Sequence, residues 1–154
     1  MKNRNVVSVP VRARSAPALL GGQIRGSLSN YAANLFCRAF RWTIVQSRGR
    51  FEGIDKQGAR YQIRGRQQTH HGHSRVIRPI RNLDRRPFDH LAVVVVDGGF
   101  NVVRAATIPI EMVLGRALHA GTDAWKLPLP EEIWTAKAVH DVTDFIRATA
   151  STQT

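Results

Sequence analysis

Apolar residues recur at helical spacing in three stretches of the chain. The first covers residues 27–42, where Ser27 is a suitable N-cap, and the second begins at Pro109, a residue favoured in the first helical turn. The third covers residues 138–148, and its apolar side is formed by Val139, Val142, Phe145 and Ile146. We therefore predict a helix near each end of the domain and another after residue 109.

Strand patterns lie between these helices. Residues 42–47 are short and β-branched, and the segments FEGI and ARYQIRGR flank a D-K-Q-G turn in which Gly58 can adopt positive φ. HLAVVVVD is a continuous apolar run, typical of a central strand covered on both faces. The segment FNVVRAATI follows a D-G-G turn and predicts its hairpin partner, and WKLPLP is predicted to be extended.

The segment between the first hairpin and the central strand is harder to assign. Residues 67–74 are polar and predict a loop, whereas apolar positions 76, 77, 80 and 83 have roughly helical spacing, so we predict a short helix beginning near Pro79. The whole order indicates an α/β fold, with one mixed sheet flanked by helices. We expect a flexible basic arm over residues 1–24 and a single domain over residues 25–150.

Charge is distributed unevenly along the chain. The net charge is +12, but residues 1–90 hold 18 Lys or Arg against 4 acids, whereas residues 91–154 hold 5 against 7. Nineteen of the 23 basic residues are arginine, whose planar guanidinium suits phosphate and base-edge contacts. This asymmetry favours a polyanionic partner, most simply nucleic acid, over a basic surface that only aids solubility.

Other features narrow the class of protein. The single cysteine, Cys37, cannot form an internal disulfide, fits a reducing compartment, and is expected to be buried in the first helix. No apolar run approaches the roughly 20 residues of a membrane span. We therefore expect a cytoplasmic protein without a membrane partner.

Four segments carry a resemblance to a known family: FEGIDKQGARYQIRGR at 51–66, SRVIRPIRNLD at 74–84, RPFDHLAVVVVD at 86–97 and VVRAATIP at 102–109. Together they resemble small bacterial proteins of the restriction-endonuclease-like PD-(D/E)XK superfamily. The likeness extends over residues 27–150, and RNLDRRPFDHLA is its most specific part. It implies a restriction-endonuclease-like mixed central β-sheet flanked by helices.

The resemblance also implies a catalytic site on the hairpin. In the superfamily, an acid on one strand and an acid two residues before a lysine on the next strand hold Mg²⁺, and the lysine acts on the attacking water. Glu52 occupies the first acid position, Gln62 the second and Arg64 the lysine position. Glutamine brings no negative charge, and arginine does not give up its proton near neutral pH.

Further departures weaken the metal chemistry. Ser27 and Asn30 stand where relatives carry glutamate, and Val76 replaces a glutamine. We therefore expect a vestigial catalytic site with no bound metal, in which Glu52 is the one weak candidate ligand. The alternative for Glu52 is a solvated strand residue paired with an arginine across the hairpin.

The candidate nucleic-acid-binding residues are arginines of the hairpin and of the segment that follows it. A helix over that segment would place every third residue on one face, where the side chains could line a phosphate groove. The candidates are Arg60, Arg64, Arg66, Arg75, Arg78, Arg81, Arg85 and Arg86. His70, His71 and His73 lack a fourth zinc ligand nearby and are interpreted as part of a polar loop.

Three functions remain open from the sequence. The first is a DNA-binding protein, regulatory or architectural, that contacts double-stranded DNA through its arginines. The second is an active Mg²⁺-dependent endonuclease, and the third is an assembly module whose basic face meets an acidic partner. The apolar segment around Trp125 and Trp134 leaves room for a homodimer.

Overall fold

The computed structural model describes residues 24–47, 50–68 and 76–152. The expected basic arm, nearly all of the 67–74 loop with its three histidines, and Arg75 lie outside these ranges. Within them, no helix is both long enough and apolar enough to cross a membrane.

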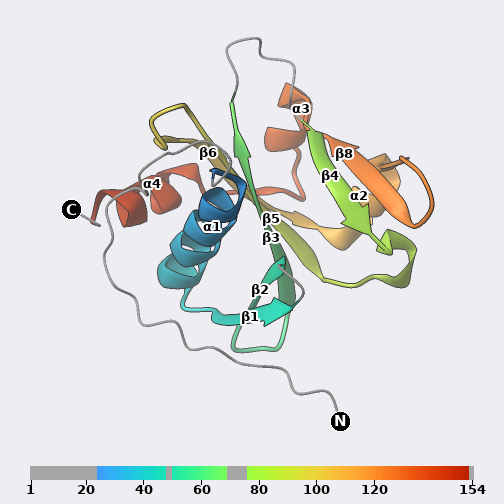
Figure 1. Cartoon of the computed structure of the whole chain (residues 1–154), viewed down its shortest axis with the longest axis horizontal. Helices are drawn as coiled ribbons and strands as arrows, with labels where there is room; N and C mark the ends of the chain where they lie inside the picture. The colour runs from blue at the N-terminus through green and yellow to red at the C-terminus, as the bar shows by residue number, and fades with distance from the viewer. Residues whose placement is uncertain (1–23, 48–49, 69–75, 153–154) are drawn as a thin grey trace.

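The centre of the fold is a six-stranded sheet with the order β1-β2-β3-β5-β6-β9 (Figure 1). β3 and β5 pair in parallel, and every other neighbouring pair is antiparallel. The bounds are Thr43–Ser47 for β1, Arg50–Ile54 for β2, Arg60–Gln67 for β3, His90–Val96 for β5, Val102–Pro109 for β6 and His140–Asp141 for β9. The predicted mixed α/β architecture is confirmed.

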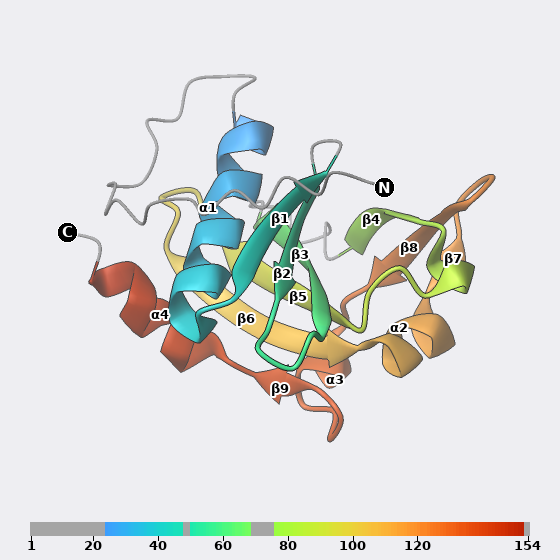
Figure 2. The same cartoon turned by 90° about the horizontal axis from the view of Figure 1, so that it is seen from below.

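Two helices, α1 (Ile24–Phe40) and α4 (Thr143–Ser151), cover one face of this sheet (Figure 2). A Cβ atom at Gly65 of β3 would lie 2.9 Å from Leu28 Cγ, so only glycine lets α1 approach this closely. Cys37 is buried in this layer, and its burial raises the pKa of the thiol to about 12. The expected buried position of Cys37 is confirmed.

A second, smaller sheet covers the opposite face together with two short helices (Figure 1). Its strands are β4 (Val76–Arg81), β8 (Ala124–Pro128) and β7 (Leu118–His119), and the helices are α2 (Ile110–Arg116) and α3 (Glu131–Trp134). Leu91 and Val93 of β5 pack into this side, while Ala92 and Val94 pack under α1, and all four are fully buried. The prediction of a central strand covered on both faces is confirmed.

The prediction of a short helix near Pro79 is wrong, because the segment forms β4, which is followed by a 3-10 turn over Leu83–Arg85. The pairing register of β4 with β8 shifts between Ile77 and Ile80, so both isoleucines point into the core although they are three residues apart. An irregular strand therefore reproduced the spacing of a helix face.

The C-terminal elements also differ from the prediction. The last helix begins at Thr143, after the short strand β9, and Phe145 is 51% exposed instead of facing inward. Trp134 is only 6% exposed and lies beneath the guanidinium of Arg104, 5.4 Å from the ring centre. This tryptophan is therefore part of the core and does not form the exposed homodimer surface that the sequence suggested.

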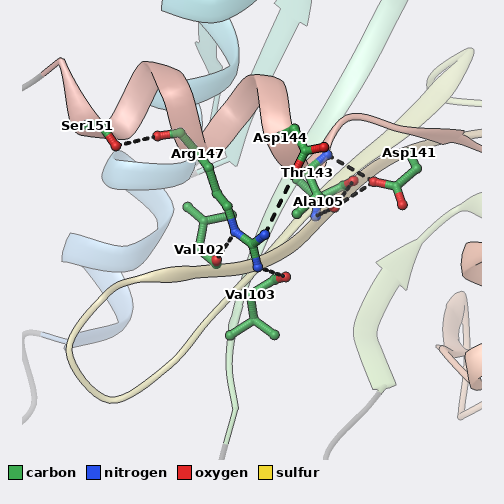
Figure 3. A network of polar contacts seen from close by, with 8 residues as sticks. All are labelled: Val102, Val103, Ala105, Asp141, Thr143, Asp144, Arg147 and Ser151. Carbon is green, nitrogen blue, oxygen red and sulfur yellow. Dashed lines mark hydrogen bonds and ion pairs between the residues drawn. The ribbon is translucent and has the colours of Figure 1, made fainter.

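Side chains of α4 close the outer edge of β6 (Figure 3). Arg147 donates from Nε to the Val102 carbonyl at 2.9 Å and from Nη2 to the Val103 carbonyl at 3.0 Å. The Thr143 hydroxyl oxygen accepts a hydrogen bond from the Ala105 amide at 3.0 Å. These contacts occupy backbone groups that an unpaired edge strand would otherwise offer to another chain.

Thr143 also organises the turn before α4. Its amide and hydroxyl donate to Asp141 Oδ1 at 2.9 and 2.5 Å, and the hydroxyl contact is the main cause that lowers the pKa of the Asp141 carboxyl. A lowered carboxyl pKa contributes stability near neutral pH, and this contribution is lost as the pH falls below the usual aspartate range of about 4.

Replacing Thr143 with Val should lower the free energy of unfolding by about 1–3 kcal/mol, because the Ala105 amide loses its acceptor. Urea denaturation measures this difference. Thr143→Ser keeps the hydroxyl and is the matched control, which should retain most of the stability. A valine variant as stable as the wild type would contradict the role assigned to the hydroxyl.

Candidate functional site

The turn between β2 and β3 is shaped by Asp55. Its carboxylate accepts hydrogen bonds from the amides of Gln57 and Ala59, both at 2.9 Å, and from the Tyr61 hydroxyl at 3.0 Å. Gly58 has φ of 85°, as the predicted turn requires. Burial, and then the contact with Asp55, raise the pKa of Tyr61 to about 12. Asp55 is thus committed to the turn and does not supply a second acid to the candidate site.

The three candidate catalytic residues lie together on the hairpin. The register pairs Glu52 of β2 directly with Gln62 of β3, and cross-strand partners have Cβ atoms about 4.5–5.5 Å apart. Arg64 follows two residues along the same strand and therefore shares their face of the sheet. Gly53 lies on the other face, because a Cβ atom there would be 2.5 Å from the Trp42 ring.

Gln62 is the unusual member of this group. It is 2% exposed, and its Oε1 atom is buried with no hydrogen-bond partner among the described residues. Most buried side-chain polar atoms have a partner, and an orphaned one costs about 1–3 kcal/mol. The amide oxygen of Gln62 therefore lacks the hydrogen bond that its burial calls for, in the residue paired across the hairpin with Glu52.

The donor set suits Mg²⁺ only in part. Mg²⁺ binds proteins through one or two carboxylates and completes its shell with water and substrate phosphates. Glu52 supplies one carboxylate and Gln62 a neutral oxygen, and no group of three or more His, Cys, Asp or Glu side chains suited to a metal occurs in the described ranges. At this pair of residues Glu52 is thus the one carboxylate, and water and a phosphate would have to supply most ligands of a cation bound there.

Arg64 extends from the hairpin to the second sheet. Its Nη2 atom donates to the backbone carbonyl of Pro79 in β4, and the side chain is partly buried. A guanidinium stays protonated at neutral pH, so this residue can hold a phosphate but cannot take a proton from water. The contact also brings the exposed arginines of β4, Arg78 and Arg81, to the same region of the molecule.

Arg60 is held at the other end of the strand. Its amide donates to Asp89 Oδ2 at 2.8 Å, its Nε lies 3.7 Å from the same oxygen, and its Nη2 donates to the Arg86 carbonyl at 3.2 Å. Arg86 itself lies 3.4 Å from Glu111, in an exposed pair. Arg66 is on the same face as Arg60 by strand alternation and is partly buried.

Three of the candidate arginines differ from Arg60 and Arg86, and from the arginines of the C-terminal half, in their partners. Arg104, Arg116 and Arg147 each lie within 3.8 Å of a carboxylate, from Glu131, Glu132 and Asp144 respectively. Over the described ranges, Arg78, Arg81 and Arg85 form no such ion pair and are exposed. The charge asymmetry of the sequence is therefore preserved in the folded chain.

One hollow of the surface was not anticipated from the sequence. It is an open groove of about 840 Å³ beside α4, lined by Phe40, Val142, Phe145, Arg104 and Arg147 among others. The residues come from distant parts of the chain, so no local pattern announces it. Phe145, which the sequence pattern placed on the inward side of the helix, is exposed here, and the centre of its ring lies 5.1 Å from that of Phe40.

Replacing Gln62 with Leu should leave the free energy of unfolding unchanged or raise it, because the orphaned amide oxygen is removed at similar volume. Urea denaturation measures the effect, and Ile63→Val, expected to cost about 0.5–1.5 kcal/mol, shows that the assay detects small changes in this strand.

A loss of more than about 2 kcal/mol in Gln62→Leu would mean that the oxygen has a partner in solution. Thermal melts with and without Mg²⁺ identify that partner as the cation if Mg²⁺ stabilises the wild type but not the leucine variant.

Comparison with known proteins adds no family to this geometry. No protein-family model matches the sequence, and a search of curated proteins gave no significant match.

Proposed function

We propose that this chain binds double-stranded DNA through the arginines of β3 and β4, on a restriction-endonuclease-like fold whose cutting centre is reduced. The observation that carries the proposal is the position of Arg64. It lies beside the paired Glu52 and Gln62, and its guanidinium is held by a backbone carbonyl of β4.

The order of elements supports the fold named in this proposal. A helix precedes a three-stranded antiparallel meander, and β5 then pairs in parallel with the third strand of the meander. The chain departs from the resemblance in the crossover between β3 and β5, which carries the strand β4 and a 3-10 turn where a helix was expected.

The electrostatics of the arginines support a polyanionic ligand. A carboxylate partner neutralises a guanidinium, whereas a backbone carbonyl positions it and leaves its charge in place. Arg64 is oriented by such a carbonyl, and Arg60 by a carbonyl and a carboxylate. Side chains at alternate positions of a strand are about 6.6 Å apart, so Arg64 and Arg66 leave β3 side by side on one face, while Arg60 on the same face is paired with Asp89. Phosphates of a nucleic-acid backbone are the ligands that such a row suits.

The reduced cutting centre supports binding without cleavage. Glu52 is the one carboxylate of the paired positions, because Gln62 is neutral and Asp55 is held in the turn. Arg64 cannot serve as a base. A regulatory or architectural role on DNA follows from these properties.

A Mg²⁺-dependent endonuclease is the second candidate, and the orphaned Oε1 atom of Gln62 favours it. In that case Glu52 and Gln62 would ligate the metal and Arg64 would hold the phosphate. When bound, the metal would stabilise negative charge on the phosphate and supply an activated water.

Duplex DNA should bind to the full chain in EDTA, with an affinity that falls at least tenfold between about 50 and 200 mM salt, because about two phosphate contacts alone produce that loss. Fluorescence anisotropy measures this. Arg78→Ala with Arg81→Ala should reduce the salt slope by about two. The control is Arg116→Ala, whose guanidinium is paired with Glu132 and should leave the slope unchanged.

Failure of both duplex and single-stranded DNA to bind at low salt would overturn the proposal. It would favour the third function, an assembly module that meets an acidic protein. If Arg116→Ala reduced the salt slope as much as the double variant does, DNA binding would depend on the total charge and not on the position of the arginines.

The wild type should not cut DNA in Mg²⁺ or Mn²⁺, whereas Gln62→Glu with Arg64→Lys should gain metal-dependent cutting. The variant adds a second carboxylate and a side chain whose proton can be released. Plasmid nicking assays measure both proteins, and adding Glu52→Ala to the double variant should abolish the gain. Cutting by the wild type that is lost in Glu52→Ala would establish the nuclease candidate instead.

A further inference from the structure

The turn that follows β4 displays polar and charged side chains around one buried anchor. It comprises residues 82–86 and is called the 82–86 turn below. It follows β4, at the side of the molecule where the second sheet lies (Figure 2). Leu83 is fully buried, whereas Asn82, Asp84, Arg85 and Arg86 are all exposed. The apolar residue therefore fixes the turn to the core, and the other four side chains face the surroundings.

Hydrogen bonds hold the backbone of the 82–86 turn to both sheets. Two backbone hydrogen bonds, of 2.9 and 3.0 Å, close the turn itself. The Asn82 amide donates to the carbonyl of Asp123, the residue before β8, at 3.0 Å. At the other end, the Arg86 carbonyl accepts a hydrogen bond from Nη2 of Arg60 in β3, at 3.2 Å. The turn is thus tied at each end to a different sheet.

Two residues of the turn have left-handed backbone conformations. Asn82 has φ of 52°, and Arg86 has φ of 49°. Asparagine is enriched in this conformation, but residues with long side chains such as arginine seldom adopt it. Strained residues persist where the surrounding contacts impose them, and they are concentrated at functional sites. The contacts of the 82–86 turn therefore impose its shape, which makes it a rigid support for its side chains.

Asp84 does not suit a surface that only attracts phosphate. It lies in the sequence between Arg81 and the pair Arg85 and Arg86, yet over the described ranges it forms no ion pair with any of them. An exposed carboxylate repels phosphates, but it can accept a hydrogen bond from the N4 amino group of cytosine. The acid therefore fits a contact with bases better than a contact with the DNA backbone.

We infer that the 82–86 turn enters the major groove of duplex DNA and makes binding depend on sequence, with Arg85 donating to a guanine and Asp84 accepting from a cytosine. This inference rests on the proposed function and adds sequence recognition to it. The major groove is the one in which all four base pairs can be distinguished, and arginine binds O6 and N7 of guanine there with two hydrogen bonds.

The rigidity of the turn matches the geometry that such a contact needs. Two hydrogen bonds to one base require the guanidinium at a fixed place, and a support that is already ordered lowers the entropic cost of binding. Neither Arg85 nor Asp84 forms an ion pair within the described residues, so no internal carboxylate or guanidinium competes with the bases. Arg78 and Arg81 of β4 keep the contacts to phosphate, which set affinity and carry no sequence information.

Selection by the full chain from a library of duplexes with a randomised centre, in EDTA, tests the inference. The enriched duplexes should share one or two G·C base pairs at fixed positions. Fluorescence anisotropy should then show that replacing one of these pairs with A·T weakens binding about tenfold, as the loss of one contact to a base edge predicts.

Arg85→Lys keeps the positive charge but lacks the planar fork that binds guanine with two hydrogen bonds. This variant should lose the preference at one G·C pair, while the salt dependence of binding stays the same. Its matched control is Arg116→Lys, which makes the same exchange far from the turn in sequence and should retain the preference. Circular dichroism and thermal melts show that each variant folds like the wild type.

Asp84→Asn separates the reading of bases from simple attraction. If the turn faced only phosphates, removal of this negative charge would strengthen binding to every duplex alike. We expect instead that the variant loses its preference at the same G·C pair or at the neighbouring one. Asp144→Asn removes the same charge from α4 and should leave the preference unchanged.

Equal binding of all duplexes, with no enriched sequence, would overturn the inference and leave the proposed function in place. So would a preference that both Arg85→Lys and Asp84→Asn retain, because the turn would then not read the bases. Stronger binding of Asp84→Asn to every duplex would assign the turn to phosphate contacts and equally overturn it. If no duplex binds at all, the inference and the proposed function both fail.

Discussion

The parallel pairing of β3 with β5 is the constraint on which the arrangement of the molecule depends. Parallel neighbours cannot be joined by a tight turn, so the chain between them must cross the sheet. Here the crossover runs over the face opposite α1 and places β4 beside the hairpin, where the Pro79 carbonyl receives the side chain of Arg64. The same pairing buries β5 between two apolar layers, which fixes both faces of the sheet.

From this constraint follows the separation of charge in the folded chain. The crossover carries the exposed arginines Arg78, Arg81 and Arg85, and in the hairpin Arg64 donates to a carbonyl oxygen, whereas Arg60 and Arg86 lie beside carboxylates. The C-terminal elements carry most of the acids, and Arg104, Arg116 and Arg147 there each lie beside a carboxylate. Positive charge is therefore concentrated in one region, and the C-terminal half holds a slight excess of acids. The proposed function depends on this difference more than on the total charge.

Much of the fold could be predicted from the sequence, because local patterns there agreed with the tertiary structure. The continuous apolar run HLAVVVV predicted a strand buried on both faces, and it forms β5. The D-K-Q-G turn predicted the hairpin in which Glu52 pairs with Gln62. The prediction of a helix around Pro79 was wrong because a register shift in β4 turns both Ile77 and Ile80 inward. Buried residues three positions apart are the spacing expected of a helix. Nothing local signals such a shift, since it is defined by the partner strand β8.

The sequence predicted which residues form the candidate site, but it did not predict their burial or their contacts. The resemblance named Glu52, Gln62 and Arg64, and the structure places them together on one face. The burial of Gln62 and the hydrogen bond from Arg64 to the Pro79 carbonyl depend on contacts between distant segments, so local sequence patterns could not predict them.

The closure of β6 by α4 has a consequence for the lifetime of the protein. The groups that cover this edge belong to the last helix described, and a protease that cut the chain before residue 143 would remove Thr143 and Arg147 at once. The trimmed product would expose the carbonyls of Val102 and Val103 on a strand rich in valine and alanine. Such a fragment would be prone to aggregate, so the intact C-terminal helix acts as a safeguard of solubility as well as a part of the fold.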